Sequence, residues 1–128
     1  MKDQKDQKDP RDPKRIGIPN INFSTYSEGD RREKEFLKQR LDRGFDESET
    51  WQLYQTISGF ICPRLRAFKI ANCCHPPEMT PEKWDEILDK MIRSFELVDK
   101  SDFLSEKEAE EIREGLNLFT EYFFALWW

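Results

Sequence analysis

Two basic side chains in the middle of the chain, Arg64 and Lys69, could bind an anion. They belong to the stretch 47–71, in which apolar residues recur at helical spacing. The stripe consists of Tyr54, Ile57, Ile61, Leu65 and Phe68. An ideal helix places Arg64 on this stripe, between Ile61 and Phe68. A guanidinium in that position must reach solvent or meet a negative charge.

Two interpretations of Arg64 are open. In the first, Arg64 pairs with an acid of the following helix, or a kink at Pro63 turns it outward. The available acids are Asp85, Asp89 and Glu96. In the second, Arg64 and Lys69 hold a phosphate or a partner's carboxylate, and a nearby ring stacks on a base. The candidate rings are Trp51, Tyr54 and Trp84.

The segment 72–80, NCCHPPEMT, carries two cysteines and the single histidine of the chain. Zinc ligands usually converge from separated positions, whereas Cys73, Cys74 and His75 are consecutive and have no second cluster. A nucleophilic cysteine needs a base that faces it, which neighbouring side chains in a proline-bounded loop rarely do. The chain has no phosphate-binding loop and no nucleophile elbow. We therefore expect no metal, no cofactor and no catalytic residue, although a hydrolase that uses paired carboxylates stays open.

The last ten residues contain six aromatic side chains. They are Phe119, Tyr122, Phe123, Phe124, Trp127 and Trp128. A surface helix is apolar on one stripe, whereas a helix continued through this end is apolar all round from Tyr122 onward. We therefore expect the cluster to be buried, with part of it at an interface with a second copy or another protein. The expected interface residues are Tyr122, Phe123, Phe124, Trp127 and Trp128.

Four helices must position these side chains. Periodicity predicts them over roughly 31–43, 47–71, 81–98 and from 105 onward. Asp46 and Ser105 each precede a glutamate by three residues, which predicts capping boxes, and Thr80 is followed by a proline that suits a first helical turn. The predicted apolar face of the first helix is Phe36, Leu37 and Leu41, with Gly44 as its stop. Gly115, inside the last helix, predicts a close helix crossing.

The predicted fold class is all-α, a small bundle of about four helices with an extended or disordered N-terminal arm. Residues 1–15 form a charged low-complexity tail, KDQ, KDQ, KDP, RDP, which cannot bury enough apolar surface to order itself. Residues 16–29 carry apolar side chains around Pro19 and predict an extended arm that lies on the body. Residues 30–128 are the predicted helical bundle domain.

Composition excludes several classes of protein. The net charge of −5 argues against a binder of bulk nucleic acid. The charged N-terminus lacks a secretory signal, and three cysteines, two of them adjacent, make no disulfide framework. The longest wholly apolar run, 123–128, is far too short to span a membrane. These features favour a cytoplasmic protein.

Three stretches of the chain resemble small all-helical proteins encoded by tailed phages and prophages. The stretches are FDESETWQLYQTISGFICPRLRAFK, MTPEKWDEILDKMIRSFELV and GLNLFTEYFFALWW. The resemblance covers roughly residues 33–128 and includes no catalytic motif. It implies a non-enzymatic binding protein that acts in the host cytosol on a host component, and the aromatic C-terminal cluster favours a homo-oligomer. A counter-defence inhibitor with a protein target or a sequestered nucleotide signal is the expected role; a virion assembly module and a small nucleotide hydrolase are the alternatives.

Overall fold

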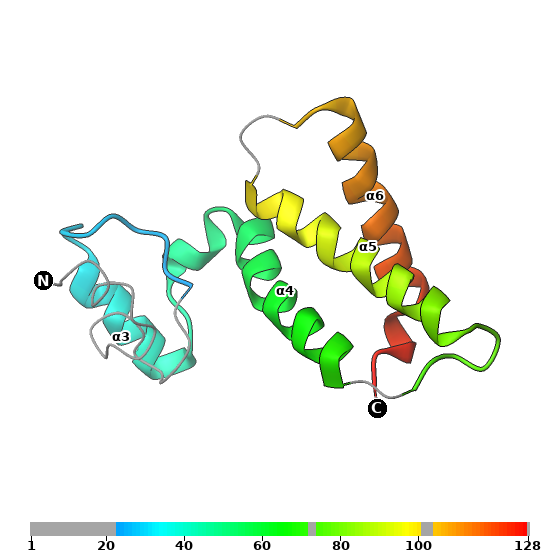
Figure 1. Cartoon of the computed structure of the whole chain (residues 1–128). Coiled ribbons are helices and arrows are strands. Elements are labelled where there is room, and N and C mark those ends of the chain that lie inside the picture. Colours follow the sequence, from blue (N-terminus) through cyan, green and yellow to red (C-terminus); the bar gives the residue numbers. More distant parts are fainter. Residues whose placement is uncertain (1–22, 72–73, 101–103, 128) are drawn as a thin grey trace, which may run out of the picture. The chain divides into compact units, whose positions relative to one another are not determined.

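The computed structural model describes residues 23–71, 74–100 and 104–127. Their helices are α3 (Glu33–Arg43), α4 (Leu53–Ala71), α5 (Pro81–Lys100) and α6 (Glu106–Glu121), with the short 3-10 helices η1 (Glu47–Thr50) and η2 (Phe123–Ala125) (Figure 1). The described residues thus contain four α-helices and no strand, which confirms the all-α prediction. The predicted tail, and the predicted arm up to residue 22, lie outside the described residues.

The chain divides into two compact units. The first ends at Thr56 and the second begins at Ile57, so the boundary falls near the start of α4. The range 30–128, which the sequence predicts as one domain, spans both units. Each unit has its own buried centre, and the two centres differ in chemistry.

The first unit buries an arginine where an apolar face was expected. On α3 the buried residues are Phe36 and Arg40, four positions apart on one face, whereas Leu41 is 62% exposed. The predicted face is therefore wrong at Leu41. Gly44 ends α3 as predicted, with a left-handed φ of 93° and its N–H donating to the Arg40 carbonyl over 2.9 Å.

The predicted helix over 47–71 is two elements. The capping box of Asp46 and Glu49 is present as predicted, but it begins the 3-10 turn η1, and α4 starts only at Leu53. The physical reason lies in the Asp46 side chain. Besides capping η1, it accepts hydrogen bonds from the hydroxyls of Ser24 and Ser48, both at 2.5 Å. This network fixes a tight turn that periodicity alone does not reveal.

The second unit packs α4, α5 and α6 around an apolar cluster (Figure 1). Its buried members are Cys62, Leu65, Trp84, Ile87, Leu88, Met91, Ile92 and Phe95. The buried residues of α4 are Ser58, Cys62 and Leu65. Of the predicted stripe, Leu65 is buried and Ile61 and Phe68 pack against the cluster, whereas Tyr54 and Ile57 are exposed. Pro63 lies inside α4, as predicted.

Helix α5 supplies most of this core and crosses α6 closely. Its start is as predicted, since the Thr80 hydroxyl accepts from the Lys83 backbone N–H over 3.1 Å. At the crossing, a Cβ added to Gly115 would lie 2.4 Å from the Lys90 carbonyl oxygen. The close crossing predicted from Gly115 is therefore confirmed. Lys90 also bridges the helices by an ion pair with Glu114 at 2.9 Å.

The C-terminal end departs from the prediction. Ser105 caps α6 in a capping box as expected, but the helix ends at Glu121 and the chain turns into η2. Ala125 and Leu126 then pack on the core. Phe124 is 90% exposed and Trp127 is 73% exposed, so within one chain only part of the aromatic cluster is buried. The 3-10 turn ends the helical periodicity, and Phe123, Phe124 and Trp127 are exposed on either side of Ala125 and Leu126.

Candidate functional site

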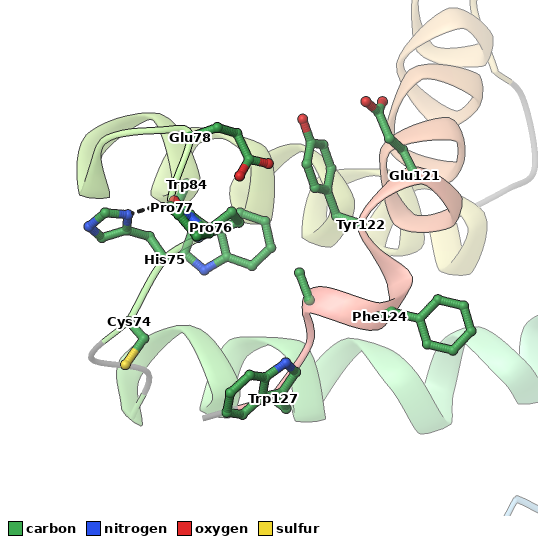
Figure 2. A pocket seen from close by; sticks show the side chains of 11 residues that line it. Cys74, His75, Pro76, Pro77, Glu78, Trp84, Glu121, Tyr122, Phe124 and Trp127 are labelled. Atoms are coloured by element: carbon green, nitrogen blue, oxygen red, sulfur yellow. Dashed lines mark hydrogen bonds between the residues drawn. The ribbon is translucent and has the colours of Figure 1, made fainter.

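A cavity of about 680 Å³ opens at the end of the second unit where α6 turns into η2. Its walls come from the segment 74–78, the first turn of α5 and the end of the chain (Figure 2). The lining residues are Cys74, His75, Pro76, Pro77, Glu78, Trp84, Glu121, Tyr122, Phe124, Ala125 and Trp127. We call this cavity the Trp84 pocket. Its volume lies within the roughly 300–1,000 Å³ typical of ligand sites.

Trp84 forms the inner wall of the pocket. Its side chain is 2% exposed and meets the Tyr122 ring edge-to-face, with ring centroids 5.8 Å apart. Figure 2 shows the indole between the 74–78 segment and Tyr122. Its buried Nε1 has no hydrogen-bond acceptor among the described residues. Buried indole N–H groups usually have a partner, so this donor is an unusual unpaired polar atom behind the pocket.

The charged residues of the pocket are acidic. Glu78 and Glu121 line it from the loop and from the end of α6, and no lysine or arginine is among its described lining residues. Desolvation, together with the negative charges of Glu121 and Glu78, raises the pKa of Tyr122. The His75 ring is oriented by a 2.9 Å contact between its Nδ1 and the Pro76 carbonyl oxygen, drawn in Figure 2. The pocket therefore combines aromatic walls with a negative potential.

A chain of aromatic contacts leads from the core to the outside of this region. Phe95 is buried and meets Phe119 edge-to-face, with ring centroids 5.3 Å apart. Phe119 meets Phe123 in the same way at 5.5 Å, and Phe123 meets the exposed Phe124 at 5.5 Å. Because each ring rests on the previous one, the exposed rings are presented on a packed support.

The predicted anion-binding residues of the second unit do not meet in one pocket. Arg64 is exposed, and its guanidinium donates to the Phe60 carbonyl over 2.8 Å and stacks 3.9 Å from the centroid of the Phe60 ring. Lys69 pairs with Asp89 at 2.7 Å. Trp84 faces the cavity described above, of which neither Arg64 nor Lys69 is a lining residue.

The other two predicted rings lie in the first unit. Trp51 meets Phe36 edge-to-face at 5.8 Å, and the Arg32 guanidinium lies 5.1 Å from a ring centroid of Trp51. Tyr54, at the start of α4, is exposed. Among the predicted interface residues, Tyr122, Phe123, Phe124 and Trp127 gather at the end of the second unit, and Trp128 lies outside the described residues.

The acidic residues of the pocket, Glu78 and Glu121, are not among the site residues predicted from the sequence. Glu78 lies in a loop whose cysteines and histidine alone suggested chemistry. Glu121 is one of 26 Asp and Glu residues, so nothing distinguishes it by residue type. A usable signal exists in the sequence, because Glu121 immediately precedes the aromatic run and Glu78 immediately follows two prolines. That both line one pocket, however, depends on the fold, which brings the 74–78 segment beside the end of α6.

In the part of the chain that the structure describes, no three His, Cys, Asp or Glu side chains cluster as metal ligands would. Every helix there is too short or too polar to cross a bilayer. Comparisons with protein-family models, with curated proteins and with solved structures find no match to this chain.

Proposed function

We propose that this chain is a non-catalytic binding protein that holds a protein partner through Phe123, Phe124 and Trp127. We call these three residues the aromatic face. The observation that carries the proposal is the exposure of Phe124 and Trp127, which are 90% and 73% accessible beside a formed pocket. Exposed clusters of large apolar side chains mark interaction sites, and aromatic residues dominate the binding energy of protein interfaces.

A protein partner fits this region better than a nucleotide signal. A nucleotide carries phosphates, which are bound by basic side chains or by backbone N–H groups at a helix N-terminus. The Trp84 pocket has two glutamates instead. The resemblance to phage-encoded proteins makes a host component the natural target, so the proposed role is inhibition of a host defence protein in the cytoplasm. Self-association through the same aromatic face is the alternative that the experiment must separate.

The test compares the wild-type chain with a double variant, Phe124→Ser with Trp127→Ser. A matched control is Ile70→Ser, which removes an 87% exposed apolar side chain from α4 instead. Each protein is immobilised in bacterial lysate, and bound proteins are identified by mass spectrometry and then purified for a direct titration. We expect wild type and the Ile70→Ser variant to bind the purified partner with equal affinity. The double variant should lose at least about tenfold, since hot-spot residues contribute about 2 kcal/mol or more.

Sedimentation velocity over a range of concentrations tests the alternative, self-association through the aromatic face. A stable dimer of the wild type that the double variant lacks would assign the aromatic face to a second copy. A purified partner that binds the double variant as tightly as wild type would refute the proposed function.

A further inference from the structure

We propose that the Trp84 pocket binds a basic side chain of the partner, so that the segment entering it is a cationic peptide. This inference rests on the proposed function and names the chemistry that the pocket recognises. Two features of the lining point to it: aromatic rings surround the opening, and the charged residues are acidic. Both features favour a cation.

The lining selects a cation. The faces of Trp and Tyr rings attract a positive charge, and the attraction grows when the cation is partly desolvated. Tyr122 and Trp127 supply such rings around the opening, and Glu78 and Glu121 supply negative charge on two sides (Figure 2). The same two carboxylates, behind desolvation, raise the pKa of Tyr122, which agrees with a negative potential in the cavity. An arginine guanidinium suits the site well, because it is weakly hydrated, stacks on aromatic rings and forms forked hydrogen bonds with carboxylates.

A peptide residue with a basic side chain suits the cavity better than a simple ammonium ion or a metal ion, because its aliphatic stem packs on the aromatic lining while its charge meets the acids. The volume of about 680 Å³ leaves room for backbone as well as for one side chain.

The experiment follows the indole N–H signals of the full chain, labelled with ¹⁵N, by NMR. The chain contains four tryptophans, so the Trp84 signal can be assigned with single Trp→Phe variants at the other positions. The probes are the capped tripeptides acetyl-Gly-Arg-Gly-amide and acetyl-Gly-Lys-Gly-amide. The neutral control replaces arginine by citrulline, which keeps the shape and loses the charge, and adenosine monophosphate is the anionic control.

We expect both basic peptides to shift the Trp84 signal more than the signals of the first unit. The citrulline peptide should bind at least about threefold more weakly, since only the charge is removed. Glu78→Gln and Glu121→Gln should each weaken binding of the arginine peptide about two- to fivefold, the range of partly exposed ion pairs. Glu110→Gln removes a charge from α6 outside the Trp84 pocket and should leave the affinity unchanged.

Three results would overturn the inference: equal binding of the citrulline peptide, unchanged affinity in both glutamate variants, or a Trp84 shift with adenosine monophosphate that exceeds the shift with arginine. The two proposals can fail separately. If the purified partner needs the aromatic face but binds the Glu78→Gln and Glu121→Gln variants as wild type, only the cation site is wrong. If the partner binds the double variant as tightly as wild type, the proposed function is wrong, whether or not the tripeptides bind.

Discussion

Arg40 and Arg64 occupy opposite environments in the two units of this molecule. Arg40, in the first unit, is 1% exposed, and its Nη1 donates to Asp46 Oδ2 over 2.5 Å and to Ser24 Oγ over 2.7 Å. Arg64, in the second unit, is exposed. Its guanidinium contacts the carbonyl and the ring of Phe60, in the same helix. The arginine that apolar periodicity places on a buried stripe is outside, and the one that drew no notice is inside.

The difference extends to how each unit is held together. The first unit closes around an ion pair whose hydrogen bonds join α3, η1 and the segment before α3. The second closes around an aliphatic and aromatic cluster. Removing one member of a buried ion pair strands a charge, whereas truncating an apolar side chain leaves a cavity. The units should therefore differ in their response to charge removal, to truncation and to pH.

The largest expected effect is that of Asp46→Ala. It leaves the Arg40 guanidinium buried without its carboxylate and removes the cap of η1, and breaking such a pair costs about 3–5 kcal/mol. We expect the first unit to unfold while amides of α5 and α6 stay protected from hydrogen exchange. The control is Asp42→Ala, which removes an exposed partner of Lys38 and should cost less than about 1 kcal/mol. Equal loss of protection in both units would contradict their separate stabilisation.

Leu88→Ala should produce the next largest effect, in the second unit. Leu88 is 0% exposed at the centre of α5, and truncation of a buried leucine costs about 2–5 kcal/mol through lost burial and the cavity left behind. The free energy of unfolding from urea titration measures it. Leu116→Ala, at a partly exposed position of α6, is the control and should cost clearly less. Comparable losses in both variants would mean that the apolar cluster is not centred on α5.

Acid should weaken the first unit selectively. Burial alone would raise the pKa of Asp46, but hydrogen bonds from Ser24, Ser48 and Arg40 outweigh it and hold this pKa below its ordinary value. The folded pKa is the lower one, so the contribution is complete above the unfolded value of about 4 and is lost as the pH falls towards the folded value. First-unit amide signals should therefore disappear below about pH 4, before those of the second unit.

Glu49 supplies the internal control for this pH dependence. Burial raises the pKa of Glu49, so its contribution has the opposite sign: it is present at low pH and is lost as the pH rises through the raised value. Glu49→Gln should therefore stabilise the first unit at neutral pH and leave the acid transition of Asp46 in place. Persistence of both units to the same low pH would contradict the role assigned to Asp46.

Capping signals and helix periodicity predict most of the helical elements. The caps at Asp46, Thr80 and Ser105 are chemical patterns of adjacent residues, and all three form as expected. The sequence does not reveal that one side chain can stabilise two elements at once. Asp46 caps η1 and also binds Arg40, which depends on a contact between separate elements.

In the candidate site, too, local patterns are visible in the sequence, whereas features that depend on the fold are not. Clustering of Phe123, Phe124 and Trp127 at one end is visible in the sequence, but their exposure depends on the turn at Tyr122, which no strong breaker residue announces. The predicted stripe on α4 is right at Ile61, Leu65 and Phe68 and wrong at Tyr54 and Ile57. Arg64 directly precedes the buried Leu65, and about 100° of helical rotation separates consecutive side chains, so Arg64 is exposed.

The smallest expected effect sharpens the comparison between the two arginines. Arg64→Ala should change the free energy of unfolding by no more than about 0.5 kcal/mol, because exposed side chains away from special features contribute little. Thermal and urea denaturation measure it, with Arg113→Ala on α6 as an exposed control. A loss above about 2 kcal/mol would show that Arg64 is buried in solution and would restore the ion-pair interpretation. A folded Arg64→Ala variant that still binds the partner but no longer binds a nucleotide would instead revive the anion site, because only the guanidinium would then account for the difference.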